Sequence, residues 1–178
     1  MYLHGILDID GILYTELEQL AEIIRSSGYY NQKAVKLQNL AKILHQTSIS
    51  QLHSLSMEDL RLFLLAIKGI GPETADSILL YGFHHPSFVV DAYTRRLLFR
   101  MGYMSPPSTY NTIQTLFQTE IPPEEALYNE YHALIVQHMV RVCKKKPKCE
   151  ECMLKPNCAK IIPLPPPQKK FHKKNSSI

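Results

Sequence analysis

Apolar residues recur at every third or fourth position along most of this 178-residue chain. This spacing is typical of helices that bury one face. The runs predict helices over residues 15–27, 32–45, 57–66, 72–83, 91–102, 109–119 and 123–142. The sequence shows no sustained alternation of apolar and polar residues, the pattern that would indicate strands. The pattern therefore predicts an all-α protein.

Residues at the ends of these runs define their predicted limits. Thr15 and Glu18 have the spacing of a capping box at the start of the first helix, and Gly28 ends that helix. Ser56 is a favoured N-cap for the helix that follows it. The polar stretch 48–56 is typical of a loop.

A short glycine-containing segment joins the helices predicted at 57–66 and 72–83. Gly69 and Gly71 can adopt backbone conformations that side chains forbid, and Pro72 suits the first position of a helix. The two glycine N–H groups would then face outward at a helix N-terminus, where anions bind. The anion that we expect is a DNA phosphate. The candidate DNA-binding residues are Lys68, Gly69, Ile70 and Gly71.

All four cysteines lie in one segment near the C-terminus, with the spacing C-x5-C-x2-C-x5-C. A disulfide is disfavoured because the chain shows no secretory signal. Four thiolates suit either a structural zinc ion or a [4Fe–4S] cluster, and the spacing leaves both open. Neighbouring lysines would offset the thiolate charge and could also reach a phosphate backbone. The candidate metal ligands are Cys143, Cys149, Cys152 and Cys158.

Composition narrows the class of protein. Apolar residues make up 45% of the chain, as expected of a folded protein with a core. No apolar run is long enough for a membrane-spanning helix, and the N-terminus lacks the pattern of a secretory signal. These features favour a cytoplasmic, nucleoid-associated protein with no membrane partner. No segment indicates an obligate protein partner.

Charge is unevenly distributed along the chain. The formal net charge is +4, yet residues 141–178 contain 11 lysines and arginines against 2 acidic residues. This basic end suits a polyanion, and a solvated tail is the alternative for its last residues. From residue 161 onward the chain is rich in proline and then in lysine, which predicts a disordered tail over 161–178.

Other polar residues of the predicted helices receive structural interpretations. Arg95 and Arg96 are assigned to an exposed helix face, although phosphate contact is the alternative. The eight histidines form no i, i+4 pair with an acid that would indicate a metal site. His132 and His138, on the helix 123–142, are interpreted as packing or hydrogen-bonding residues.

Three markers, in this order and at this spacing, resemble the endonuclease III family of helix-hairpin-helix DNA glycosylases. They are the hairpin Lys68–Ala75, the segment Val89–Arg96 and the cysteine segment. A weaker fourth match is Gly28–Ala34. The resemblance covers about residues 8–160.

The resemblance implies an enzyme of DNA repair that excises a damaged or mismatched base from double-stranded DNA. The target nucleotide would turn out of the duplex, and the N-glycosidic bond would then be hydrolysed. Asp91 matches the family's catalytic aspartate, and a carboxylate there can stabilise positive charge or activate water. The alternative is that Asp91 only caps the helix 91–102, and both roles can coexist. The four cysteines would hold a [4Fe–4S] cluster rather than zinc.

Two further positions follow from the same resemblance. Tyr29 stands where the family places a wedge, meaning a side chain that enters the duplex opposite the flipped base. The alternative for Tyr29 is packing at a helix end. Glu73 stands where bifunctional members carry the lysine that forms a Schiff base and allows strand cleavage. A carboxylate cannot form that bond, so the resemblance implies a monofunctional glycosylase. The alternative for Glu73 is a helix N-terminal acid favoured by the dipole.

The chain departs from the family at two places. The first cysteine spacing is one residue shorter than usual, and the chain begins almost at the helix 15–27, where relatives have a longer N-terminal segment. We therefore expect an incomplete six-helix barrel with the helix-hairpin-helix motif in residues 1–107, a cluster lobe in 108–160 and the basic tail. The alternative function is a non-catalytic or remnant DNA-binding protein. The sequence does not indicate which base is excised.

Overall fold

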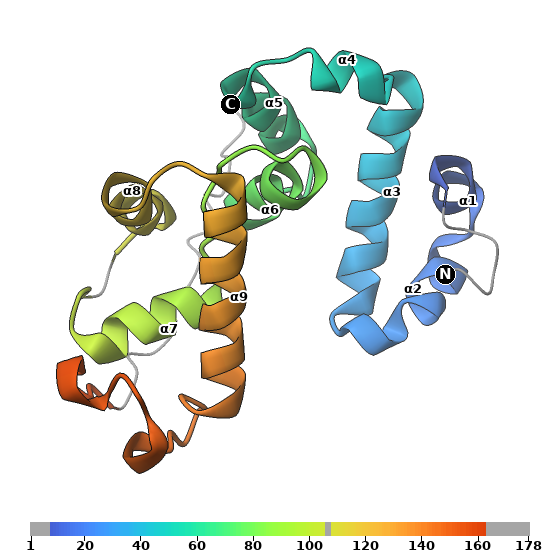
Figure 1. Cartoon of the computed structure of the whole chain (residues 1–178). Helices are drawn as coiled ribbons and strands as arrows, with labels where there is room; N and C mark the ends of the chain where they lie inside the picture. The colour runs from blue at the N-terminus through green and yellow to red at the C-terminus, as the bar shows by residue number, and fades with distance from the viewer. Residues whose placement is uncertain (1–7, 106–107, 163–178) are drawn as a thin grey trace, which may run out of the picture. The chain divides into compact units, whose positions relative to one another are not determined.

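The computed structural model describes residues 8–105 and 108–162. Within these ranges every regular element is helical, which confirms the predicted all-α class (Figure 1). None of the described helices is long and apolar enough to span a bilayer. Apart from Ile161 and Ile162, the predicted tail lies outside the described residues. The α-helices are α1 (Ile9–Tyr14), α2 (Leu17–Ile23), α3 (Tyr30–Gln46), α4 (Ile49–His53), α5 (Met57–Ala66), α6 (Pro72–Gly82), α7 (Ala92–Met101), α8 (Tyr110–Glu120) and α9 (Glu125–Arg141), and the 3-10 turns are η2 (Arg25–Ser27), η3 (Cys149–Glu151) and η4 (Lys155–Asn157).

The N-terminal part differs from the prediction. The single helix expected at 15–27 is wrong, because an unpredicted α1 precedes it and the rest divides into α2 and η2. Asp8 caps α1 by accepting a 2.6 Å hydrogen bond from the Gly11 amide. Thr15 follows the end of α1 in an extended conformation, and Glu16 is the N-cap of α2 without a side-chain bond. The predicted capping box at Thr15 is therefore wrong, whereas Gly28 ends η2 with a φ of 66°.

The loop predicted over 48–56 is also wrong in its first half. Residues Ile49–His53 form α4, and Ser48 and Gln51 form a capping box at its start. Leu52 is 1% exposed and anchors this short helix in the apolar core. The helix forms because a local cap and one buried leucine act together, although polar residues dominate the segment.

The described chain divides into two compact units. The first unit combines Met1–Val89 with Gln114–Tyr131, and the second combines Val90–Ile113 with His132–Ile178. The sequence analysis predicted two consecutive parts that meet at residue 107. Each of the two compact units instead combines two segments that are distant in sequence.

Two apolar clusters are found among the described residues of the first unit. In one, α2 packs on α3 through Leu20, Ala21, Ile24 and Ala34. The other gathers buried side chains of α4, α5, α6 and the segment between α5 and α6, namely Leu52, Leu60, Leu64, Ile67, Ile70, Ala75 and Leu79. The second cluster therefore holds the hairpin rigidly, since two of its members, Ile67 and Ile70, belong to the hairpin itself.

The second unit is held by α7, the second part of α9 and the cysteine segment. Buried apolar side chains of the two helices include Leu97, Leu98, Ile135 and Met139. The chain after the last cysteine returns to the end of α7, where the Ile161 amide donates to the Arg100 carbonyl at 3.1 Å. Gly102 ends α7 with a φ of 85°.

Candidate active site and cysteine site

The hairpin between α5 and α6 depends on one glycine with an unusual backbone conformation. Gly69 has a φ of 96°, and a Cβ there would lie 2.9 Å from the Lys36 Cγ. Gly71 has a φ of −103°, an extended conformation open to any residue, so the expectation that its backbone needs a glycine is wrong. It is the N-cap of α6, where glycine is tolerated, and Pro72 follows at the start of the helix as predicted.

The hairpin presents a site for an anion. Within the described residues, the Gly69 and Gly71 amides donate to no carbonyl oxygen, and they lie at the positive end of the α6 dipole. Lys68 is exposed beside them. Ile70 is 8% exposed, so its side chain belongs to the core and only its backbone can face a ligand.

Helix α3 adds residues to the same site that were not predicted. The Asn39 side-chain amide donates to the Lys68 carbonyl at 2.9 Å. Lys36 is exposed, and its aliphatic stem lies against Gly69. These contacts place a second lysine, from a helix distant in sequence, beside the hairpin.

Tyr29 immediately precedes α3 and points into solvent. Its side chain is 85% exposed and its backbone is left-handed, with a φ of 49°. The high exposure contradicts the alternative that Tyr29 packs at a helix end. The adjoining turn is fixed by a 2.6 Å hydrogen bond from the Lys33 ammonium to the Ser27 carbonyl.

Asp91 is the N-cap of α7, as its sequence position predicted. Its Oδ1 accepts hydrogen bonds from the Thr94 amide at 2.7 Å and from the Thr94 hydroxyl at 2.9 Å. Its Oδ2 lies 3.7 Å from the Nε2 atom of His132 on α9. Burial by itself would raise the pKa of Asp91, but the approach of His132 and the two bonds from Thr94 outweigh it. The pKa therefore lies below the ordinary value of a carboxyl group, and Asp91 is ionised at neutral pH.

A buried polar network fixes the chain that leads to α7. Asp76 is fully buried and accepts hydrogen bonds from Arg61, at 2.7 and 3.0 Å, and from the Ser87 hydroxyl at 2.7 Å. The Gln114 side-chain amide donates to the Phe88 carbonyl at 2.9 Å. These hydrogen bonds hold residues 87 and 88 in place, shortly before Asp91 in the chain.

Glu73 lies in the first turn of α6 and is exposed. A carboxylate at this position interacts favourably with the N-terminal end of the helix dipole. Its backbone carbonyl accepts a 2.7 Å hydrogen bond from the Ser77 hydroxyl. Glu73 therefore lies where a helix N-terminal acid is expected, which is the alternative interpretation of this residue.

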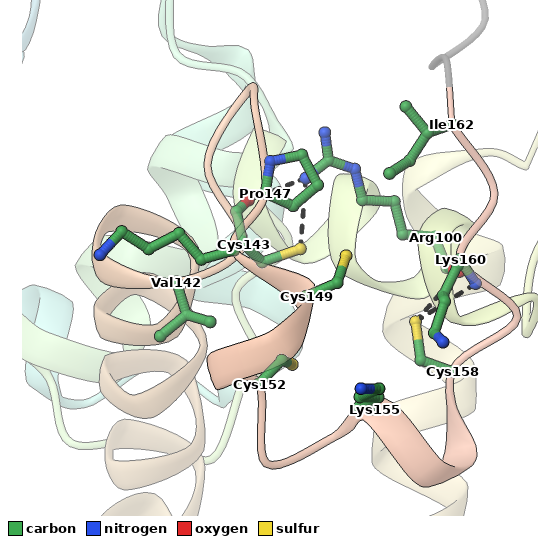
Figure 2. Close-up of a pocket in the computed structure, with 11 residues that line it drawn as sticks. Arg100, Val142, Cys143, Pro147, Cys149, Cys152, Lys155, Cys158, Lys160 and Ile162 are labelled. Atoms are coloured by element: carbon green, nitrogen blue, oxygen red, sulfur yellow. Dashed lines mark hydrogen bonds between the residues drawn. The ribbon is translucent and has the colours of Figure 1, made fainter.

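The four cysteines are free thiols that line one pocket (Figure 2). Arg100 also lines this pocket and is 3% exposed. One terminal nitrogen of its guanidinium donates to the Cys143 sulfur at 3.2 Å and to the Cys143 carbonyl at 2.9 Å. On the opposite side, the Lys160 amide donates to the Cys158 sulfur at 3.4 Å. The described residues include no group of three or more His, Cys, Asp or Glu arranged around a single metal ion.

Comparison with known proteins decides the family. Residues 3–123 match the HhH-GPD superfamily of base excision DNA repair proteins. This chain belongs to the HhH-GPD superfamily. The matched range includes the hairpin and Asp91 and ends before the cysteine segment.

Two relatives of the HhH-GPD protein support the same assignment. A proposed DNA repair glycosylase of Methanocaldococcus jannaschii is 41% identical over 152 residues, which cover 83% of this chain and 69% of that protein. Endonuclease III of Sulfolobus acidocaldarius is 31% identical over 155 residues, with 86% and 68% covered.

Solved structures share the HhH-GPD fold. A non-covalent endonuclease III–DNA complex matches with a TM-score of 0.73 at 24% identity, covering 89% of this chain and 72% of that one. The 3-methyladenine DNA glycosylase of H. pylori, bound to 1,N6-ethenoadenine, matches with a TM-score of 0.63 at 29% identity, covering 77% and 72%. The predicted resemblance to endonuclease III is therefore confirmed.

Two residues of the HhH-GPD protein have contacts that the sequence did not predict. Arg100 lies three residues after Leu97 and six after Thr94, both of which are buried on α7. A charged residue on this apolar face was the sequence feature that could have indicated a buried arginine. His132 was assigned to packing or hydrogen bonding, and its approach to Asp91 has no local signal. His138 lies 3.6 Å from the Cys152 sulfur, consistent with its predicted role, and burial lowers its pKa.

Proposed function

We propose that this HhH-GPD protein is a monofunctional DNA glycosylase that hydrolyses the N-glycosidic bond of a damaged or mismatched base in double-stranded DNA. The observation that carries the proposal is the Asp91 carboxylate, which is held ionised at the start of α7 with a lowered pKa. An ionised carboxylate is the group that this bond cleavage requires.

The chemistry proceeds on a nucleotide turned out of the duplex, at an unstacking cost of a few kcal/mol. As the bond to the base breaks, positive charge develops on the sugar. Asp91 stabilises that charge electrostatically or directs the attacking water. The two hydrogen bonds from Thr94 hold Oδ1 of this carboxylate at the start of α7.

The hairpin supplies the grip on DNA in this proposal. A phosphate binds the amides of Gly69 and Gly71, with Lys68 and Lys36 adding positive charge. Tyr29 is the wedge, because an aromatic ring that is 85% exposed on a constrained turn can stack on bases.

The absence of lyase activity follows from Glu73. Strand cleavage by the family's bifunctional members uses a lysine amine as the nucleophile. Glu73 occupies that position here and has no amine to form a Schiff base. Lys68 is assigned to phosphate binding, so the product is an abasic site in an intact strand.

The cysteine site fits an iron–sulfur cluster, and zinc is the alternative. Four thiols line one pocket, and a buried guanidinium donates a hydrogen bond to the Cys143 sulfur. Thiolates of a [4Fe–4S] cluster bind separate iron atoms, so they need not converge on one ion as in a zinc site. Such a cluster would fix the C-terminal segment.

The decisive experiment measures base release from duplex oligonucleotides that carry one oxidised pyrimidine, one alkylated purine or one mismatch. Alkali converts each abasic product into a strand break, so cleavage with alkali but not without it supports a monofunctional glycosylase. Asp91→Asn should lower the single-turnover rate constant at least about 100-fold. DNA binding without base release from any substrate would instead favour the non-catalytic DNA-binding function.

A further inference from the structure

The two oxygens of the Asp91 carboxylate have different partners. Oδ1 accepts both hydrogen bonds of the helix cap from Thr94. Oδ2 takes no part in that cap and lies 3.7 Å from His132 Nε2. Both side chains are 14% exposed, so the pair is screened only weakly by solvent. Capping α7 accounts for Oδ1, and it leaves the placement of His132 unexplained.

His132 is presented to Asp91 by a well-packed part of the second unit. On α9, Ile135 and Met139 follow His132 on the same helical face and are 7% and 1% exposed. On α7, Arg96 donates to the Met139 carbonyl at 3.4 Å. The two helices therefore hold the ring and the carboxylate at a fixed separation.

The other nearby cations of α7 are directed to different groups. Arg95 donates to the Ser108 carbonyl at 3.2 Å and lies over the ring of Tyr110. Arg96 lies over the ring of Tyr93 as well as binding α9. Among the described residues, His132 is the basic side chain that lies within 4.0 Å of Oδ2.

We propose that His132 is a positioning residue that holds Oδ2 of Asp91, so that the ionised carboxylate keeps one orientation toward the substrate sugar. The inference rests on the proposed function, in which Asp91 acts on the sugar. An imidazole with a proton on Nε2 serves this purpose, because it favours the charged carboxylate and restricts its rotation. Errors of about 1 Å in such groups cost up to about 100-fold in rate.

The first test compares two substitutions in the full chain. His132→Phe keeps the volume of the ring and removes its nitrogen, whereas His132→Gln keeps an N–H donor. We expect His132→Phe to lower the single-turnover rate of base release about 10- to 100-fold while the Kd for lesion-bearing duplex changes less than about threefold. His132→Gln should recover the rate to within about fivefold of wild type.

The matched control is His45→Phe, which breaks a histidine–aspartate pair of the first unit. His45 lies 2.9 Å from Asp10 on an exposed surface, and its loss should leave base release unchanged. A His132→Phe rate within twofold of wild type would overturn the proposal. The proposal would also be overturned if both His132 variants lost DNA binding and failed to fold, because that result would show a purely structural role.

A second measurement does not depend on activity. The pKa of Asp91 can be followed by 13C NMR of its labelled carboxyl group. His132→Phe removes an influence that lowers this pKa, while burial continues to raise it, so the pKa should rise. An unchanged pKa would overturn the inference even in an active enzyme. If the wild-type protein released no base, the proposed function would fail, and the carboxyl titration would still decide whether His132 acts on Asp91.

Discussion

Arg100 donates a hydrogen bond to the Cys143 sulfur at 3.2 Å while it also binds the backbone around that cysteine. Its two terminal nitrogens reach the carbonyl oxygens of Cys143, Lys144 and Lys145 at 2.6 to 3.0 Å. These residues lie at the start of the stretch from Cys143 to Cys149. This stretch is one residue shorter than the usual pattern of the family that the sequence resembles. A buried arginine thus organises the shortened loop from inside.

Replacing Arg100 by leucine should destabilise the protein. Three partly buried carbonyl groups would lose their charged donor, so we expect the free energy of unfolding to fall by about 1–3 kcal/mol. Chemical denaturation followed by circular dichroism measures the change. Arg141→Leu, on the exposed end of α9, is the matched control and should change stability by less than about 0.5 kcal/mol. Equal effects of the two substitutions would contradict the role of Arg100.

The cysteine site should contain iron when the protein is purified without oxygen. We expect about four iron atoms and four acid-labile sulfides per chain, with a brown colour. Cys149→Ser should lose most of this iron because one thiolate ligand is missing. Metal analysis and visible absorption provide the readout. Colourless protein with zinc and no iron would establish the alternative metal.

The two hairpin glycines should respond differently to alanine. Gly69→Ala forces a side chain into a left-handed conformation and brings Cβ to 2.9 Å from Lys36, so it should cost about 1–2 kcal/mol. Gly71→Ala meets no atom within 4 Å at an ordinary φ and changes only the N-cap, at a cost below about 1 kcal/mol. Thermal unfolding of the two variants tests this order, and a larger loss for Gly71→Ala would contradict it.

Substitutions of Asp91 should separate its cap from its chemistry. Asparagine caps helices about as well as aspartate, so Asp91→Asn should retain stability and lose base release. Asp91→Ala should lose base release and also about 1 kcal/mol of stability. Denaturation and single-turnover assays on the same samples distinguish the roles. Base release by Asp91→Asn at nearly the wild-type rate would exclude the catalytic assignment.

The same carboxylate predicts a pH dependence. Because the folded pKa of Asp91 lies below its ordinary value, the carboxylate contributes stability above the unfolded pKa and loses it as pH falls through the folded pKa. Base release should therefore persist through mildly acidic pH and decline only when Asp91 is protonated. A pH–rate profile of the wild-type protein measures this. An acid limb near neutral pH in the wild-type profile would contradict a lowered pKa of Asp91 as its cause.

Tyr29 should matter for base release and little for folding. Its side chain is 85% exposed, so Tyr29→Ala should change stability by less than about 0.5 kcal/mol. Losing a stacking contact worth about 1–3 kcal/mol should lower the rate of base release at least about fivefold. Tyr14→Ala removes another exposed tyrosine, 71% exposed, and serves as the control. Similar rates for both variants would argue against the wedge.

Local chemistry explains which elements could be predicted. The limits of α5, α6 and α7 follow from Ser56, Pro72, Asp91 and Gly102, which act on backbone groups within a few residues of themselves. The errors lie where two local signals compete. Asp8 caps an earlier helix than the expected one, and Ser48 starts a helix inside a polar stretch. In both places the apolar pattern alone was too weak to decide.

The sequence by itself determined the helical class, the hairpin, the cap at Asp91 and the grouping of the four cysteines, because each depends on residues close together in the chain. Only the tertiary structure decided that His132 faces Asp91, that Arg100 binds the loop at Cys143 and that Lys36 lies against Gly69. These pairs join segments distant in sequence. Their contacts depend on how buried helix faces pack, and no local pattern of residues encodes that packing.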